Sequence, residues 1–240
     1  MNVSSFNALA EFAANAGLDL IFGLNERNRT ADGTPGGRWA LETATPLIKH
    51  AFTNKQVKGF ELGNEFDINV QKNKTAFDMA PGVIAADFVV LADYLRKVYG
   101  SLNGGTTSSP LLLGCDVAVN LEFLEQFAGN LSSSGHASDL GALTWHHYYE
   151  NGHTSKASDF IRPALLDTLW DSVDQVQQIK AKYLPDAEPI LGESSSAYDG
   201  GTYGVSDRFA STFWWLDQLG YAAYAGHKAV FRQSFTGSAY

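Results

Sequence analysis

Strand-like and helix-like segments alternate along the whole 240-residue chain, and this alternation restricts the possible folds most strongly. Short apolar runs with strand character are expected at residues 18–24, 58–65, 111–116, 142–149, 189–193 and 228–235. Helices with apolar residues three and four positions apart are expected at residues 4–16, 39–53, 83–99, 121–128, 163–183 and 205–219. Such regular alternation is typical of a parallel sheet covered by helices.

The number of expected strands indicates an incomplete barrel. A closed (β/α)8 barrel has eight strands, whereas this pattern contains about six, begins with a helix and ends just after a strand. We therefore expect an α/β fold, with residues 1–240 forming a single partial (β/α)8 TIM-barrel-type catalytic domain that lacks the first two barrel strands. An open doubly wound sheet is the alternative. No Gly-x-Gly-x-x-Gly motif follows an expected strand, which argues against its nucleotide-binding form.

Composition excludes several classes of function. The net charge of -9 and the pI of about 5.0 argue against a sequence-independent nucleic-acid binder, which needs a basic surface. The single cysteine, Cys115, allows no internal disulfide. No apolar run reaches the roughly 18 residues of a transmembrane helix, and residues 1–4 lack the basic and apolar leader of a signal peptide.

Four Asn-x-Ser/Thr sequons suggest a glycoprotein. They lie at Asn2, Asn28, Asn73 and Asn130. Polar loop residues without a glycan are an equally good interpretation of each one, because the pattern is short.

Two expected strands end in a glutamate. One closes with Asn64-Glu65 and the other with Gly192-Glu193. In α/β barrels the catalytic groups lie at the C-terminal ends of the strands, and two carboxylates are the minimum for glycoside hydrolysis. In a retaining enzyme one is the acid and the other, about 5–5.5 Å away, is the nucleophile. Glu65 and Glu193 are therefore the candidate catalytic residues. Either glutamate alone could be a solvated loop residue.

The aromatic segment at residues 144–149 predicts a strand with two different faces. Because side chains alternate along a strand, His146 and Tyr148 share one face, and Trp145, His147 and Tyr149 share the other. The two histidines therefore cannot bind one metal ion together, and we expect no metal site. The face with Tyr148 could line an active site and donate a hydrogen bond to a carboxylate. An aromatic core strand with a satisfied histidine is the alternative.

Two polar segments follow the last expected strands. Residues 192–201 do not match the Gly-x-Ser-x-Gly nucleophile elbow, but Gly200 and Gly201 could offer backbone N–H groups to an anionic ligand. A flexible loop is the alternative. Residues 232–240 follow another strand end and should reach the same mouth.

These segments together resemble the heparanase and β-glucuronidase family of retaining glycoside hydrolases, glycoside hydrolase family 79. The resemblance rests on motifs in the family's order and at about its spacing. They are Glu-Leu-Gly-Asn-Glu at 61–65, Trp-His-His-Tyr-Tyr at 145–149 with Asn-Gly at 151–152, Gly-Glu-Ser-Ser-Ser-Ala-Tyr at 192–198 and Arg-Gln at 232–233. Residues 19–25 and 215–220 also resemble the family, so the match covers essentially the whole chain.

The resemblance implies a (β/α)8 barrel with Glu65 as acid/base on strand four and Glu193 as nucleophile on strand seven. Asn64 would bind the sugar 2-hydroxyl and Tyr148 would orient Glu193. The implied substrate-binding residues, several of them around the uronic acid carboxylate, are Asn64, Tyr148, Tyr198, Gly200, Gly201, Gln233, Ser238 and Tyr240. No cofactor is implied. The partner would be a glycan containing glucuronic acid, and the protein would be secreted or lysosomal. The family also has N-terminal strands and a C-terminal β-sandwich, which this chain lacks.

Three positions depart from animal heparanases. Phe66 replaces a usual proline, Val119 lies where they use a glutamine, and His153 lies where they tend to have arginine. These differences argue against endo-cleavage of heparan sulfate, and they affect a simpler β-glucuronidase acting on plant-type or arabinogalactan glycans less. A truncated or inactive relative that binds acidic glycans is the alternative function.

Overall fold

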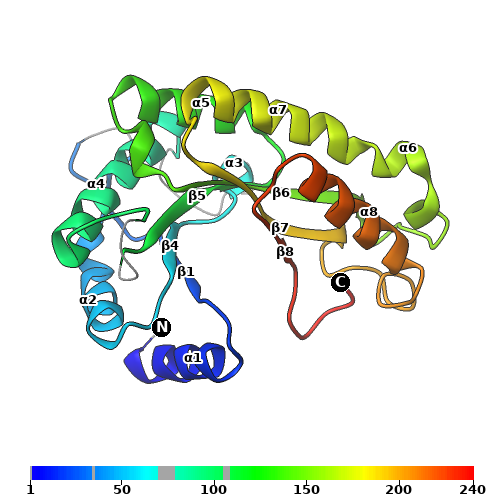
Figure 1. Ribbon diagram of the computed structural model, residues 1–240, viewed down its shortest axis with the longest axis horizontal. Helices are drawn as coiled ribbons and strands as arrows, with labels where there is room; N and C mark the ends of the chain where they lie inside the picture. Colours follow the sequence, from blue (N-terminus) through cyan, green and yellow to red (C-terminus); the bar gives the residue numbers. More distant parts are fainter. Residues whose placement is uncertain (1, 34–35, 70–78, 105–108) are drawn as a thin grey trace.

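The protein is described by a computed structural model that covers residues 2–33, 36–69, 79–104 and 109–240. Its centre is one curved sheet of six strands, all parallel, in the order β1-β4-β5-β6-β7-β8 (Figure 1). The strands are β1 Ile21–Leu24, β4 Gly59–Leu62, β5 Leu111–Val117, β6 Ala142–Asn151, β7 Glu188–Tyr198 and β8 Ala229–Arg232. The sheet confirms the predicted fold, an incomplete (β/α)8 barrel.

Helices lie along the outer side of the curved sheet (Figure 1). They are α1 Val3–Asn15, α2 Thr45–Asn54, α4 Pro81–Tyr99, α5 Leu121–Ser133, α6 Pro163–Leu166, α7 Thr168–Tyr183 and α8 Ser211–Tyr224, whereas the short α3 Phe66–Asn69 follows the C-terminal end of β4. Each long helix buries one apolar stripe against the strands. On α4 this stripe includes Phe88, whose ring packs edge-on against Phe127 of α5 at 5.0 Å. The main core therefore lies between the sheet and its helices.

The inner face of the sheet changes character along the strands. Near the strand starts, Leu113, Ala142 and Ile190 form a small separate apolar cluster. Towards the strand ends the inner side chains become polar and charged, with Thr144, His146 and Tyr148 following Ala142 along β6. The apolar cluster closes the bottom of the half-barrel, and the polar groups lie at its mouth.

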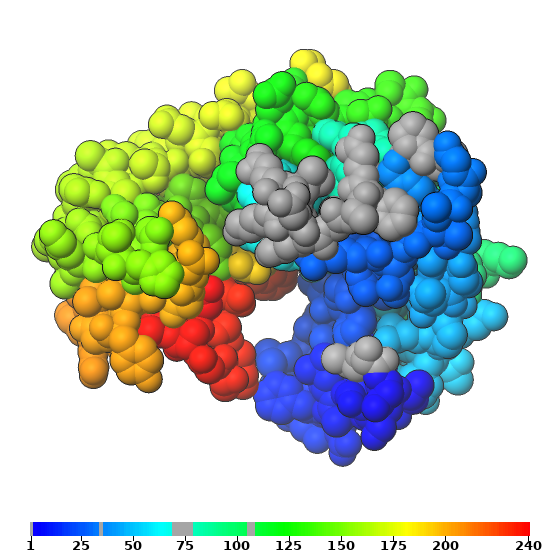
Figure 2. Space-filling model, turned by 180° about the vertical axis from the view of Figure 1, so that it is seen from behind, coloured from blue at the N-terminus to red at the C-terminus, as the bar shows by residue number. Residues whose placement is uncertain are grey.

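The two edge strands, β1 and β8, do not meet. Figure 2 shows an opening between the N-terminal segment and the C-terminal segment. Phe12 of α1 and Phe235 after β8 contact each other as an edge-on pair at 5.7 Å. Within the described part of the chain, the sheet is therefore an open half-barrel rather than a closed one.

A short strand pair lies between β1 and α2, where the sequence analysis expected no strand. β2 Arg29–Thr30 pairs with β3 Arg38–Trp39 in an antiparallel ladder. The buried guanidinium of Arg29 donates to the carbonyl groups of Gly36 and Gly37 and forms an ion pair with Asp87 of α4 at 2.7 Å. This contact joins residues 58 positions apart, so local patterns could not predict it.

Several other expected boundaries are wrong. The helix expected at residues 205–219 is α8, which begins at Ser211 and ends at Tyr224. The helix expected at residues 163–183 is divided into α6 and α7, where the Thr168 hydroxyl donates to the Leu165 carbonyl. The strand expected to end at Glu193 continues to Tyr198, because Ser194 and Ser195 pair with His147 and Tyr148 of β6. Glu193 therefore lies within β7 and does not close it.

The short helix α3 follows the turn at Glu65, in a stretch where the sequence analysis expected no helix. Residues 70–78, including the sequon at Asn73, lie outside the described residues. The other three sequon asparagines, Asn2, Asn28 and Asn130, are exposed. Among the helices of the described ranges, none combines the length and apolar character needed to cross a membrane.

Candidate active site

Glu65 lies three residues beyond the end of β4, at a tight turn. Gly63 has φ +80, and a Cβ at this position would come within 2.2 Å of the Phe66 ring, so only glycine fits. Glu65 itself has φ 53, and its N–H donates to the carbonyl of Asp116 at 2.7 Å. The turn is therefore held to the end of β5, and Glu65 is directed over the mouth of the half-barrel.

Asp67 ties the same turn to the loop after β5. Its carboxylate accepts backbone N–H groups from Ala118, Val119 and Asn120, each at 2.9 Å. Three donors on one carboxylate fix the relative position of the two loops. Phe66, the residue that departs from animal heparanases, is completely buried under this turn.

Glu193 is turned inward by a bulge in β7. Leu191 pairs with Trp145, but Glu193 and not Gly192 pairs with His146, so Gly192 is the additional residue. A Cβ on Gly192 would lie 2.7 Å from Oδ1 of Asp116, so a larger residue does not fit. The Tyr148 hydroxyl donates a hydrogen bond to Oε1 of Glu193 at 2.6 Å. Burial, together with this bond to a carboxylate, raises the pKa of Tyr148, so it keeps its proton.

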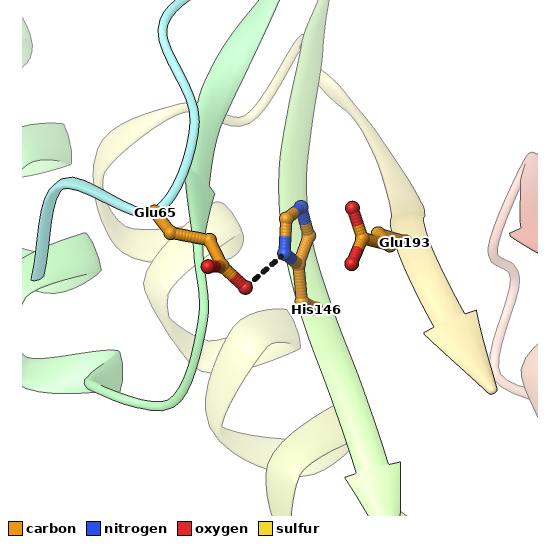
Figure 3. A group of neighbouring side chains, drawn as sticks. All are labelled: Glu65, His146 and Glu193. Carbon is orange, nitrogen blue, oxygen red and sulfur yellow. Dashed lines mark hydrogen bonds and ion pairs between the residues drawn. The ribbon is translucent and has the colours of Figure 1, made fainter. Parts of the chain in front are cut away.

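His146 connects the carboxylates (Figure 3). Its Nδ1 lies 3.3 Å from Oε1 of Glu65, and its Nε2 lies 3.5 Å from Oδ1 of Asp116. Burial alone would lower the pKa of His146, but hydrogen bonds with Asp116 and Glu65 and the nearby negative charges outweigh it and raise that pKa to about 10. At neutral pH the ring is therefore an imidazolium among several carboxylates.

Glu61 adds a further carboxyl group on the inner face of β4. Burial raises its pKa to about 9, and the charge of Asp116 acts in the same direction. The cationic His146 opposes this shift, and Glu193 adds to it. Glu61 is therefore a neutral acid at pH 7.

A cavity of about 440 Å³ opens at the mouth. Seven of the predicted site residues line it: Asn64, Glu65, Tyr148, Glu193, Tyr198, Gln233 and Tyr240. Four lining residues were not predicted: Ile68, Ala118, Val119 and Asp199. The structure therefore brings both candidate glutamates and most of the predicted binding residues into one cavity.

Three predicted binding residues do not line this cavity. Gly201 forms a bridge with Ala239, and the Gly200 carbonyl accepts the N–H of Ala239 at 2.9 Å. Ser238 lies beside them, with its hydroxyl 3.3 Å from that of Ser234. These residues dock the C-terminal segment against the loop after β7, beside the cavity lined by Tyr240.

Asp116 is the residue that the sequence interpretation missed. It is 3% exposed, and it contacts Glu65 through its carbonyl and His146 through its carboxylate. The signal was present, since an acidic residue follows the apolar run at residues 111–115, just as glutamates follow the apolar runs before Glu65 and Glu193. The missing information was that the three strand ends meet.

The structure contains one group of side chains that could hold a metal ion (Figure 3). Within the described residues, one ligand atom from each of Glu65, His146 and Glu193 lies within 4.8 Å of the others. Both ring nitrogens of His146 already face carboxylates, and a protonated imidazole has no free lone pair for a metal ion. The expectation of no metal site stays a prediction.

Residues 1–220 match the family profile described as glycosyl hydrolase family 79, N-terminal domain. The chain belongs to glycosyl hydrolase family 79. This confirms the resemblance drawn from the motifs around Glu65, His146 and Glu193.

Three curated relatives give the extent of the similarity. This family 79 chain is 35% identical to heparanase of Rattus norvegicus over 239 residues, covering 98% of the chain and 41% of that protein. It is 31% identical to inactive heparanase-2 of Mus musculus, over 98% of this chain and 38% of that protein. It is 30% identical over 243 residues to hyaluronoglucuronidase of Hirudo nipponia, covering 96% of this chain and 45% of that protein. The chain thus spans about two-fifths of the length of these relatives.

A solved structure supports the fold assignment. The 4-O-α-L-rhamnosyl-β-D-glucuronidase of Fusarium oxysporum 12S superposes with a TM-score of 0.64 at 16% identity, covering 94% of this chain and 45% of that one. At this identity the likeness concerns the fold alone.

Proposed function

We propose that the protein is a retaining glycoside hydrolase that cleaves β-glucuronide linkages in glycans containing uronic acid. One observation carries this proposal: oxygens of Glu65 and Glu193 lie within 4.8 Å of each other at one cavity. Retaining enzymes separate their two carboxyl groups by about 5–5.5 Å, whereas inverting enzymes need about 6.5–9.5 Å to admit a water molecule. The short separation supports retention.

The assignment of roles comes from the motif match, and the contacts of Glu193 support it. Glu193 accepts a short hydrogen bond from Tyr148, which suits a carboxylate that must attack as an anion. Glu65 reaches the cavity from the opposite side of His146 (Figure 3) and acts as the acid. Glu193 attacks the anomeric carbon while Glu65 gives its proton to the leaving oxygen. Water then attacks the glycosyl-enzyme and returns a proton to Glu65.

The remaining cavity residues would hold the sugar. Asn64 lies next to Glu65 and is assigned to the 2-hydroxyl of the reacting glucuronic acid. Tyr198, Gln233 and Tyr240 line the side of the cavity near the C-terminal segment. We assign the uronic acid carboxylate to this side, together with backbone groups around Gly200, Gly201 and Ser238.

Hydrolysis of p-nitrophenyl β-glucuronide tests the function. Turnover is expected from the wild type and loss of more than about 1,000-fold from Glu193→Gln, since no nucleophile remains. Glu11→Gln, an exposed substitution on α1, is the matched control and should keep full activity. Azide should restore turnover to Glu193→Gly with inversion at the anomeric carbon. Full activity in Glu193→Gln would eliminate the assignment.

An inactive glycan-binding protein is the second candidate function, because the chain is also similar to inactive heparanase-2. The presence of both carboxylates in one cavity favours the enzyme. Binding of a glucuronide without turnover by the wild type would support this second candidate instead.

We also propose that two further strands complete the barrel between β1 and β8, and that a β-sandwich accompanies it. The open edges support this proposal, as do the longer relatives. Exposed strand edges and apolar faces promote aggregation. A 240-residue preparation that is monodisperse, melts cooperatively and turns over substrate would contradict the need for these strands. A secreted or lysosomal location stays a prediction from the resemblance.

A further inference from the structure

A buried aspartate, Asp116, lies at a bulge in β5. Its neighbours Cys115 and Val117 pair with consecutive residues of β6, so Asp116 is the additional residue of the bulge. It has φ 52, a left-handed conformation that few residues other than glycine adopt. Burial of a carboxylate costs free energy unless polar or charged groups contact it. Asp116 is therefore an unfavourable choice for packing alone, and its contacts indicate a role in the adjacent site.

Two backbone hydrogen bonds hold Asp116 between the turn after β4 and strand β6. Its carbonyl accepts the N–H of Glu65 at 2.7 Å, and its own N–H donates to the hydroxyl of Thr144 at 3.2 Å. Thr144 is completely buried. The backbone of Asp116 therefore supports the turn that carries Glu65, and these two bonds do not depend on the side chain at position 116.

The carboxylate of Asp116 makes a separate connection to Glu65 through His146. Oδ1 of Asp116 lies 3.5 Å from Nε2 of His146, and a Cβ on Gly192 of β7 would come within 2.7 Å of the same oxygen. The other ring nitrogen, Nδ1, lies 3.3 Å from Oε1 of Glu65 (Figure 3). A continuous chain of contacts therefore runs from the buried Asp116 to the catalytic cavity.

Asp116 is the acidic neighbour of His146 that the reaction leaves unchanged. The acidic groups around the ring are Asp116 on β5, Glu61 on β4, Glu65 after β4 and Glu193 on β7. Burial opposes the charge of His146, and the hydrogen bond with Asp116 is the largest influence that raises its pKa. Glu61 is neutral at pH 7, and Glu65 and Glu193 take part in the chemistry. The contact between Asp116 and His146 can therefore persist through both steps.

We propose that Asp116 is a positioning residue for the acid, whose carboxylate keeps His146 charged and directed at Glu65. This inference rests on the proposed function, in which Glu65 gives its proton to the leaving oxygen. A neutral imidazole has one N–H and an imidazolium has two, so only the charged ring can donate to Asp116 and Glu65 at once. Because the ring contacts Oε1 of Glu65, the other oxygen, Oε2, is left to carry the proton towards the sugar.

The leaving group of the substrate tests this role. Asp116→Asn keeps the shape of the side chain and the backbone bond to Glu65, but it removes the charge that faces His146. The variant should lower kcat/KM about 30-fold for phenyl β-glucuronide, whose leaving group needs a proton, and only about threefold for p-nitrophenyl β-glucuronide. Equal losses on the two substrates would indicate a merely structural role and would overturn the proposal.

Asp139→Asn is the matched control. Asp139 is also buried, and its Oδ2 lies 2.8 Å from Nδ1 of His136, but it does not line the catalytic cavity. The ratio of kcat/KM for the two substrates should stay at the wild-type value in this variant. A change in that ratio as large as in Asp116→Asn would also overturn the proposal. Both variants are first checked for folding by circular dichroism.

An NMR titration of the His146 ring tests the contact without turnover. The wild-type ring should stay charged until about pH 10. Asp116→Asn should lower the titration midpoint by at least about one pH unit, because the ring loses its anionic partner, and Asp139→Asn should not change it. A neutral ring in the wild type at pH 7, or an unchanged midpoint in Asp116→Asn, would overturn the proposal whatever the activity.

The two measurements separate the role of Asp116 from the proposed function. If the wild type hydrolyses neither glucuronide, the proposed function fails, and the titration alone decides whether Asp116 holds the charge of His146. If the wild type hydrolyses both and Asp116→Asn loses both equally, the function stands and the role of Asp116 fails. The wild-type titration needs no variant, so it decides the point even if Asp116→Asn does not fold.

Discussion

His146 and His147 are neighbours in the chain but lie on opposite faces of β6, and the two faces give them opposite properties. On the inner face, carboxylates surround His146 and its pKa rises to about 10. On the outer face, aromatic rings surround His147, with Tyr149 at 4.7 Å and Trp145 at 6.1 Å. Burial there lowers the pKa of His147 to about 4. At neutral pH the inner ring is charged and the outer ring is neutral.

The difference shows how one strand serves two purposes. The outer face of β6 packs against the helices, where Trp145 donates to His227, another histidine whose pKa burial lowers to about 4. The inner face holds charges that water would otherwise solvate, and the imidazolium of His146 offsets part of the negative charge of the carboxylates there. Stability depends mainly on the outer face and chemistry on the inner one.

The largest expected effect is on catalysis by His146 variants. His146→Gln removes the cation between Glu65 and Asp116, so the Glu65 carboxylate loses this contact and is oriented less precisely. We expect kcat for p-nitrophenyl β-glucuronide to fall about 100- to 1,000-fold, within the range for disturbing general acid–base catalysis. His147→Gln, the neighbouring control, should change kcat less than about threefold. Both proteins must first be shown to be folded by circular dichroism. A similar loss of kcat in both variants would break the comparison.

The next effect is the acid stability of the outer face. The unfolded chain protonates a histidine below about pH 6.5, but folded His147 resists until about pH 4. Folding therefore loses stability as pH falls between these values, by up to about 3 kcal/mol at about 1.4 kcal/mol per pKa unit. Urea unfolding of wild type and His147→Phe at pH 7 and pH 4.5 should show a smaller loss in the variant. Parallel losses would show that folding does not lower the pKa of His147.

A smaller effect concerns Glu61, the inner-face group that stays neutral. Its pKa is raised in the folded protein, so the unfolded chain loses this proton above about pH 4.5 and the folded protein keeps it until about pH 9. Stability is therefore lost as pH rises through this window. Because Glu61 is only partly buried, we expect Glu61→Gln to be more stable than wild type by about 2 kcal/mol or less at pH 7. At pH 4 the two proteins should unfold alike, and an equal difference at both pH values would exclude a raised pKa.

The sequence was sufficient for features that depend on local periodicity. The alternation of strands and helices predicted the half-barrel, and side-chain alternation in residues 144–149 predicted which face each histidine occupies. The motifs also predicted that Glu65, Tyr148 and Glu193 act together, and the structure places all three at one cavity.

Long-range contacts were the part that could not be predicted. Ser194–Ser196 have the composition of a loop, yet they are fully buried in β7, where Ser194 and Ser195 pair with β6. Asp116 follows an apolar run in the sequence, but its contacts with Glu65 and His146, which lie 51 and 30 positions away, could not be read from that run. The ion pair between Arg29 and Asp87 could not be predicted for the same reason, because its two residues lie far apart in the sequence.

Trapping the covalent intermediate tests the central claim most directly. A 2-deoxy-2-fluoro-glucuronosyl fluoride slows both steps of a retaining reaction, so the glycosyl-enzyme accumulates and its attachment site can be read by peptide mass spectrometry. The account predicts one adduct, on the peptide containing Glu193, and none in Glu193→Gln. An adduct on another residue, or an inverted product from the wild type without any adduct, would contradict it.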